Sequence, residues 1–245
     1  MQLDNRKEIK EKIENIYSEF KNELRKKEYI DLLNGIKNDK KRNDPHKKGA
    51  GVILYTPAIY NADLMLIANN PSWFQSKKMS PLSFNANALK NLSDVENKIP
   101  TINSYISHNH EMSIKLRSYF VSKNRHYLEN CVGLNRFWIQ TGSISGIKVN
   151  GKNASREVGS PLRNLEDFCE SKTIEIVKIL KPKVLWLMGI PAQKTFKNIL
   201  PSDLGVKKIE HTLHPCQPPK NPTKQKEADK DCKDKVSRLE SFLND

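Results

Sequence analysis

Hydrophobic residues along this chain follow two periodicities, and the first of them is helical. Near the N-terminus, Ile9, Ile13 and Phe20 recur at spacings that place them on one face of a helix. This pattern predicts an amphipathic helix over residues 6–34 that packs on a core, with a coiled-coil or partner-binding helix as the alternative. The same spacing predicts further helices over residues 112–128, 162–180, 191–199 and 225–243.

Short apolar runs without helical spacing separate these helices. Such runs are typical of strands that are buried on both faces of a parallel sheet. They predict strands over residues 52–55, 63–68, 137–141, 184–188 and 206–212. Because the strands alternate with helices, we expect an α/β fold with three layers, α/β/α, around a central, mostly parallel sheet of about four strands.

The order of these elements divides the chain into three parts. We expect residues 1–48 to form an N-terminal helix and a basic loop that pack on the core, residues 49–222 to form the α/β domain, and residues 223–245 to form a charged C-terminal helix. The basic loop around Pro45 is either a solvated connector or a segment that contacts phosphates.

The net charge of the chain indicates which class of partner it binds. The 245 residues include 42 Lys and Arg against 28 Asp and Glu, which gives a formal net charge of +14 at pH 7. Such a surplus attracts polyanions and favours nucleic acid as the partner, although an AT-rich genome also produces lysine-rich proteins. No apolar run approaches the ~20 residues that span a bilayer, and the first residues lack the apolar region of a signal peptide. We therefore expect a soluble, cytoplasmic and nucleoid-associated monomer that binds DNA and no membrane.

The cysteines and histidines give no pattern of metal ligands. The four cysteines, Cys131, Cys169, Cys216 and Cys232, lie far apart and include no C-x-x-C pair, whereas zinc and iron–sulfur sites usually take two ligands from one tight turn. His108 and His110 have no carboxylate partner at ligand spacing. We expect free thiols, no metal and no organic cofactor.

Polar, turn-forming residues follow two of the predicted strands. Asn69 and Asn70 come after the strand at 63–68, and His214 comes after the strand at 206–212. In an open parallel sheet, ligands bind beyond the carboxyl ends of the strands. If these two strands are neighbours, Asn70 and His214 face each other across one cleft.

These motifs resemble those of the uracil-DNA glycosylase superfamily over residues 50–216. Ala68-Asn69-Asn70-Pro71-Ser72 is similar to the family's Gly-x-Asn-Pro-Gly or Gly-x-Asp-Pro-Tyr motif, and His214-Pro215-Cys216 is similar to its His-Pro-Ser motif. Residues 137–141, 161–169 and 181–189 are similar to its central strand, its Pro-x-x-x-Glu-x-x-Cys helix and its Pro-Lys-hydrophobic strand that ends in Gly. The resemblance implies a uracil-DNA-glycosylase-like fold.

The resemblance also implies a monofunctional DNA glycosylase that hydrolyses the N-glycosidic bond of an extruded uracil or 5-substituted pyrimidine. His214 would donate a hydrogen bond to a carbonyl of the departing base, and Asn70 would hold the attacking water. An amide is a poor general base, so the reaction would depend on leaving-group stabilisation and positioning.

Aromatic and amide side chains are expected to bind the extruded base. Phe84 follows Asn70 at about the spacing of the family's stacking residue, with Trp73 or Phe74 as the alternative. Gln140 would hydrogen-bond the edge of the base, or Thr141 if the alignment slips by one residue.

The remaining predicted contacts surround the base and the DNA backbone. Asn69 and Ser72 would border the base; because Ser72 stands where strict uracil enzymes place a Tyr that blocks a 5-methyl group, the pocket would admit bulky modified pyrimidines. The predicted DNA contacts are Lys77, Lys78, Gln217 and Lys220. The segment at 217–220 lacks the family's usual Leu or Arg wedge, so the mode of base flipping stays open.

Two other function classes fit the same sequence. One is a catalytically silent DNA-binding protein of this fold, and the other is a small-molecule nucleoside hydrolase, which would have no need of the basic charge. The sequence leaves open which base is the substrate, whether single- or double-stranded DNA is preferred, and whether the role is DNA repair or defence against phage and other foreign DNA.

Overall fold

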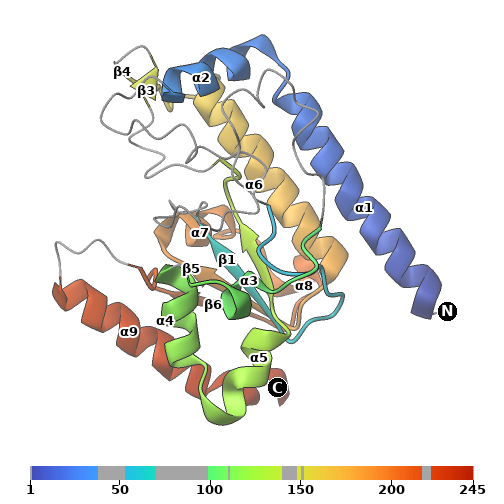
Figure 1. Cartoon of the computed structure of the whole chain (residues 1–245), viewed down its shortest axis with the longest axis vertical. Helices are drawn as coiled ribbons and strands as arrows, with labels where there is room; N and C mark the ends of the chain where they lie inside the picture. Colours follow the sequence, from blue (N-terminus) through green and yellow to red (C-terminus); the bar gives the residue numbers. More distant parts are fainter. Residues whose placement is uncertain are drawn as a thin grey trace.

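A parallel sheet lies at the centre of the chain in this computed structural model (Figure 1). The structure describes residues 2–37, 53–69, 99–109, 111–139, 148–149, 152–216 and 222–244. Within these residues the sheet has four strands, β1 (Leu64–Ala68), β2 (Val132–Asn135), β5 (Val184–Met188) and β6 (Lys208–Thr212). They lie in the order β2-β1-β5-β6 with helices on both sides, which confirms the predicted α/β/α arrangement.

One face of the sheet is covered by α6 (Pro161–Leu180), against which α1 (Gln2–Glu23) packs in turn (Figure 1). Alternate strand residues such as Ile67 and Leu187 meet the buried side of α6 in one hydrophobic core. Phe20 of α1 reaches the same core, where its ring lies edge-on to Trp138 with centroids 5.0 Å apart. The N-terminal helix is therefore a packing helix, as predicted. The same core also receives residues from α2 (Lys27–Lys37), α7 (Ile190–Thr195) and α8 (Pro201–Leu204).

The opposite face of the sheet packs on a second hydrophobic core. Leu66 and Trp186 point to this face and pack with Phe120 and Cys232. The helices on this side are α4 (Glu111–Tyr119), α5 (Arg125–Glu129), α9 (Pro222–Ser237) and α10 (Leu239–Asn244). The remaining short elements are α3 (Ser104–Ser107), η4 (Ser122–Asn124), and the antiparallel pair β3 (Lys148–Val149) and β4 (Lys152–Asn153).

Four predicted helices are shorter than the hydrophobic pattern suggested or are divided, and the one predicted over 225–243 is divided into α9 and α10. The helix predicted over 6–34 is divided into α1 and α2 by a turn at 24–26, because the apolar spacing lengthens between Leu24 and Tyr29 and the turn brings both into one core. The helix predicted over 112–128 is interrupted at Ser122, whose φ of 51° no α-helix accommodates. The helix predicted over 191–199 ends as α7 at Thr195.

Of the strand predicted over 137–141, Phe137 and Trp138 lie outside any strand and Ile139 forms a single bridge, whereas residues 140 and 141 lie outside the described residues. The strand β2, which pairs with β1, ends at Asn135. Phe137 and Trp138 are apolar because both side chains pack in the core shared by α1 and α6. The pattern did not predict β2 because Gly133 interrupts its apolar run. A glycine is needed here because an added Cβ would lie 2.5 Å from Cε2 of the buried Tyr105 ring. In the segment predicted as the strand 52–55, the described residues form only a single antiparallel bridge between Leu54 and Leu134.

Candidate functional site

The carboxyl ends of the four strands form one edge of the sheet, since all of the strands are parallel. Asn69 follows β1, Asn135 ends β2, Gly189 follows β5, and His214 lies two residues beyond β6. β1 and β6 are not neighbours, contrary to the condition stated for a shared cleft, because β5 lies between them. The ends of β1 and β6 are therefore two strand spacings apart, which amounts to about 10 Å. Gly189, which follows β5, lies between them at the same edge of the sheet.

Most of the predicted base and DNA contacts lie outside the described residues. These are Asn70, Ser72, Trp73, Phe74, Lys77, Lys78, Phe84, Gln140, Thr141, Gln217 and Lys220. Their assigned roles, including the convergence of Asn70 with His214, stay predictions. Of the predicted site residues, the structure describes Asn69 and His214.

The imidazole of His214 is partly buried and bonded to its own loop. Its Nδ1 lies 3.1 Å from the backbone nitrogen of Cys216 and 3.1 Å from the backbone oxygen of the same residue. The two contacts are alternatives: if the N–H of Cys216 donates, Nδ1 accepts and the proton of the neutral ring is on Nε2. Burial lowers the pKa of His214 and outweighs the opposite effect of the Cys216 carbonyl, so the ring is neutral at pH 7.

Gly189 packs directly against His214 at the end of β5. Its φ is 88°, and a Cβ at this position would lie 3.1 Å from Cβ of His214. The N–H of Gly189 donates to the carbonyl of Thr212 over 2.8 Å, and Nε2 of Gln193 donates to the same oxygen over 2.9 Å. The turn from β5 into α7 therefore requires glycine and fixes the backbone just before His214.

Asn69 is bound to the chain that leaves β2. The N–H of Arg136 donates to the carbonyl of Ala68 over 2.9 Å, and the N–H of Phe137 donates to the carbonyl of Asn69 over 2.8 Å. In addition, Nε of Arg136 donates to Oδ1 of Asn69 over 3.1 Å. These bonds continue the β1–β2 pairing beyond the strands and orient the Asn69 amide.

Arg136 is itself held in a buried ion network. Its side chain is 4% exposed and pairs with Glu166, which is 0% exposed, over 3.0 Å and with Glu170. Arg156 binds Glu166 through two bonds of 3.0 and 2.9 Å. Two cations thus compensate the fully buried carboxylate. Sequence reasoning missed this network, although Glu166 and Glu170 lie one helical turn apart and Glu166 falls on the apolar face of the predicted helix, where a buried acid needs a cation.

Asn135 is a second residue that sequence reasoning missed. It is fully buried at the end of β2, and its carbonyl accepts hydrogen bonds from Nε1 of Trp138 over 2.8 Å and from Oγ1 of Thr173 over 3.2 Å. Asn135 is the residue at the carboxyl end of β2, whereas Gln140 lies outside the described residues. The signal was the polar Asn135-Arg136 pair directly before Phe137, which marks the end of a strand.

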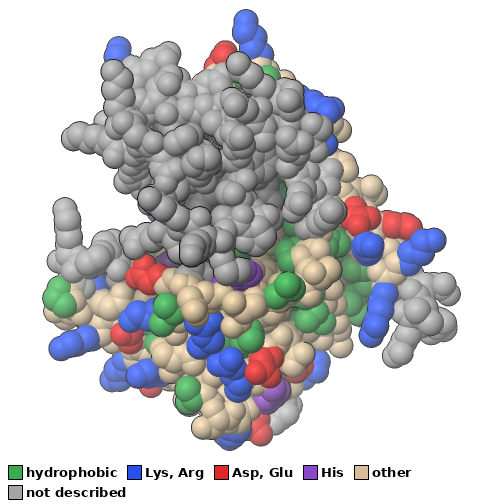
Figure 2. All heavy atoms as spheres, viewed as in Figure 1, with side chains coloured by type: hydrophobic (Ala, Val, Ile, Leu, Met, Phe, Trp, Pro, Cys, Tyr) green, Lys and Arg blue, Asp and Glu red, His purple; other side chains and the backbone are tan. Residues whose placement is uncertain are grey.

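Among the described residues on the face seen in Figure 2, basic side chains do not gather in one patch. On the face seen in Figure 2, Lys and Arg side chains are scattered among acidic ones. In the described part of the chain, no group of three or more His, Cys, Asp or Glu side chains is placed to hold a metal ion. The same residues include no helix with the length and apolar character needed to cross a bilayer.

All four cysteines are free thiols. Burial raises the pKa of Cys131, of Cys216 and of Cys232 to about 12. Burial also raises the pKa of Cys169. Burial therefore favours the protonated thiol at Cys216, the cysteine of the His214-Pro215-Cys216 motif.

No protein-family model matches the chain, and no curated protein is found as a relative.

Proposed function

We propose that this chain is a monofunctional DNA glycosylase that hydrolyses the N-glycosidic bond of an extruded uracil or 5-substituted pyrimidine. The observation that supports this most is the state of His214, a neutral imidazole at the carboxyl edge of a parallel sheet. With the Cys216 N–H donating to Nδ1, the ring presents Nε2–H as a hydrogen-bond donor.

A neutral donor suits the chemistry of this bond. As the bond breaks, positive charge develops on the sugar and negative charge on the base, and a fixed N–H aimed at a base carbonyl stabilises the anion. Because Gly189 and Thr212 fix the backbone before His214, the donor needs little reorganisation during the reaction. Water is the nucleophile, and the proposal assigns Asn70 to position it.

The amides at the other strand ends are assigned to the base. Gln140 keeps its predicted role at the base edge, and Asn135 is a further candidate, since it ends β2 at the same edge of the sheet. Asn69 is oriented by Arg136 beside it. Phe84, Ser72 and Trp73 keep their predicted roles in stacking on the base and in leaving space for a 5-substituent.

Fold and charge agree with this assignment. Ligands of open α/β sheets bind beyond the carboxyl ends of the strands, where His214 and Asn69 lie. The net charge of +14 suits a DNA partner, and the cytoplasmic nucleoid is the expected place of action. The chain resembles the uracil-DNA glycosylase superfamily in its motifs, and the proposal extends that resemblance to activity.

The test is a panel of single- and double-stranded oligonucleotides that contain uracil, thymine, 5-hydroxymethylpyrimidine or a larger 5-substituted pyrimidine. We expect free base and an abasic site from at least one of them, with activity on 5-substituted bases because Ser72 leaves space. Strict selection of uracil would contradict the open pocket. DNA binding that weakens with salt but releases no base would favour the silent DNA-binding protein, and cleavage of free nucleosides alone would favour the nucleoside hydrolase.

A further inference from the structure

Helix α9 holds the His214 segment on both sides. The N–H of Leu213, the residue before His214, donates to Oδ2 of Asp231 over 3.0 Å. The carbonyl of Pro215, the residue after it, accepts from Nε2 of Gln225 over 2.7 Å. Both partners belong to α9, so one rigid helix sets the position of the backbone on either side of the imidazole.

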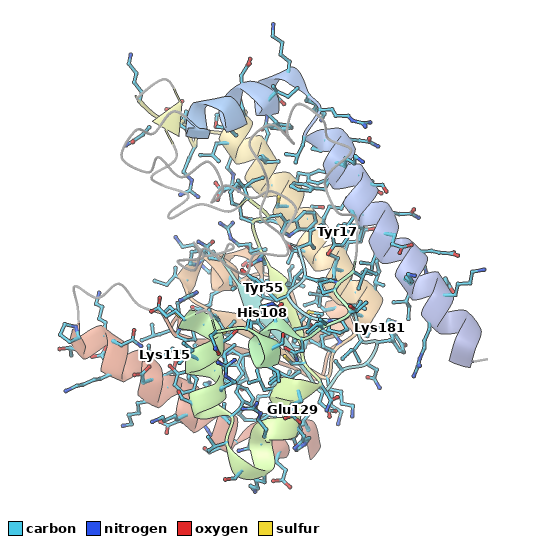
Figure 3. The ribbon with its side chains drawn as sticks, viewed as in Figure 1. Tyr17, Tyr55, His108, Lys115, Glu129 and Lys181 are labelled. Atoms are coloured by element: carbon cyan, nitrogen blue, oxygen red, sulfur yellow. The ribbon has the colours of Figure 1, made fainter. Side chains whose placement is uncertain are left out.

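The orientation of Gln225 is set by a half-buried polar cluster between α9 and α4. Nε2 of Gln225 also donates to Oδ1 of Asp229 over 2.7 Å. The same carboxylate accepts from the hydroxyl of Tyr119 over 2.6 Å and from Nζ of Lys115 over 3.1 and 3.2 Å. Lys115 projects from α4 on the side of α9 (Figure 3). We call Lys115, Tyr119, Gln225 and Asp229 the Asp229 cluster.

Asp229 is the ionised acceptor to which the other members of this cluster donate hydrogen bonds. Its burial would raise the pKa of the carboxyl, but hydrogen bonds from Tyr119, Lys115 and Gln225 outweigh that effect and hold the pKa below its ordinary value. An ionised carboxylate only accepts hydrogen bonds, so the side-chain N–H₂ group of Gln225, and not its carbonyl, must face it. The amide of Gln225 is thereby fixed in the orientation that donates to Pro215.

The bond from Gln225 acts on His214 through a single peptide plane. The carbonyl of Pro215 and the N–H of Cys216 belong to the same peptide group, in which they point in opposite directions. Gln225 binds the oxygen of this group, and the N–H on its other side lies 3.1 Å from Nδ1 of His214. Holding the oxygen therefore holds the N–H against the imidazole.

We propose that Gln225, oriented by the Asp229 cluster, is a positioning residue that fixes the Pro215–Cys216 peptide so that the proton of the His214 ring is on Nε2. The catalytic consequence rests on the proposed glycosylase function, whereas the effect on the ring itself does not. Through Gln225 the C-terminal helix α9 then positions the ring of His214.

The test replaces Gln225 by a residue of similar length that cannot donate. Gln225→Met is compared with Gln225→Lys, which keeps an N–H donor for Pro215 and Asp229, and with Lys226→Met on the adjacent exposed position as the control. Nitrogen NMR shifts of the His214 ring report which nitrogen carries the proton. We expect the Nε2–H form in the wild type, in Gln225→Lys and in Lys226→Met, and a mixture with the Nδ1–H form in Gln225→Met.

Base release provides the second readout. We expect Gln225→Met to lower kcat at least about tenfold with KM unchanged, because a ring in the wrong tautomer cannot donate to the base. If Gln225→Met does not fold, Gln225→Glu, which has the same shape and no N–H to donate, replaces it. An unchanged His214 ring in a folded donor-free variant overturns the positioning role even if the wild type releases base. A changed ring in a protein that releases no base upholds the positioning role and contradicts the proposed function.

Discussion

Individual side chains at the carboxyl edge of the sheet are held in place by buried charges and by one glycine. Arg136 binds Asn69 with one nitrogen and two carboxylates of α6 with the others, and it is almost completely buried. His214 has its ring against Gly189 and its Nδ1 against Cys216. At this scale the positions of Asn69 and His214 depend on contacts with Arg136, Gly189 and Cys216.

Removing Arg136 tests the buried network. Arg136→Met should lower the free energy of unfolding by about 3–5 kcal/mol, because Glu166 and Glu170 lose their shared cation while Glu166 stays fully buried. Urea unfolding measures the change. The control is Arg163→Met, which removes an i,i+4 pair with the half-exposed Asp167 and should change stability by less than about 0.5 kcal/mol. Equal losses in the free energy of unfolding for the two substitutions would show that the buried network stabilises the fold no more than a surface ion pair does.

Alanine substitutions at two glycines with positive φ distinguish the effect of backbone strain from the effect of contact with His214. Gly189 and Gly159 have φ of 88° and 84°, but a Cβ at Gly189 meets His214 at 3.1 Å, whereas a Cβ at Gly159 has nothing within 4 Å. Both alanine variants should lose about 1–2 kcal/mol of stability from strain. Only Gly189→Ala should also shift the NMR signals of the His214 ring and slow base release. Identical ring signals in the two variants would contradict the close packing.

The lowered pKa of His214 predicts a pH dependence of stability. The unfolded chain binds a proton near the ordinary imidazole pKa of about 6.5, whereas the folded chain binds it only at lower pH. Stability should therefore fall as the pH drops from about 6.5 towards the folded pKa. Urea unfolding across this range should show a weaker pH dependence of stability for His214→Ala than for the wild type. Equal pH dependence in wild type and His214→Ala would contradict the shift.

Among the elements, the sequence pattern predicted those whose residues are uniformly apolar and buried. It missed those in which a small or polar residue breaks the apolar run. The runs at β1 and β5 are continuous and apolar, and α6 has Ser160 as its N-cap with Pro161 next and Lys181 in the left-handed conformation at its end. The strand β2 was misplaced because Gly133 and Asn135 break its apolar run. Both residues are explained by contacts with segments distant in the sequence, which no local pattern contains. For the same reason the sequence did not point to Arg136 or Gln225, whereas the motif order alone singled out His214, whose role stays a prediction.

Gly133 gives a direct test of the placement of β2. Gly133→Ala would put a Cβ 2.5 Å from Cε2 of Tyr105, a fully buried ring that cannot move into solvent. Such overpacking costs about 1–3 kcal/mol, to be measured by thermal or urea unfolding. Combining it with Tyr105→Leu should recover part of the loss, which a double-mutant cycle would quantify. Strict additivity of the two substitutions would show that these residues are not in contact.

For the whole molecule, two layers of helices flank a sheet whose carboxyl edge brings together the ends of β1, β2, β5 and β6. The layer with α6 holds Asn69 through Arg136, and the layer with α9 holds the His214 loop through Gln225 and Asp231. The two sides of the proposed site are thus positioned from opposite faces of the sheet. The net charge of +14 completes the account by favouring DNA as the partner.

The central claim is that a neutral His214 stabilises a departing pyrimidine, and single-turnover base release from DNA tests it most directly. Using the best substrate of the panel, the rate for His214→Ala should be about a hundredfold to a thousandfold below the wild type, the cost of removing one such donor. DNA affinity should be retained, and the matched variant His211→Ala should release base at the wild-type rate. Base release by His214→Ala at the rate of the wild type would contradict the account.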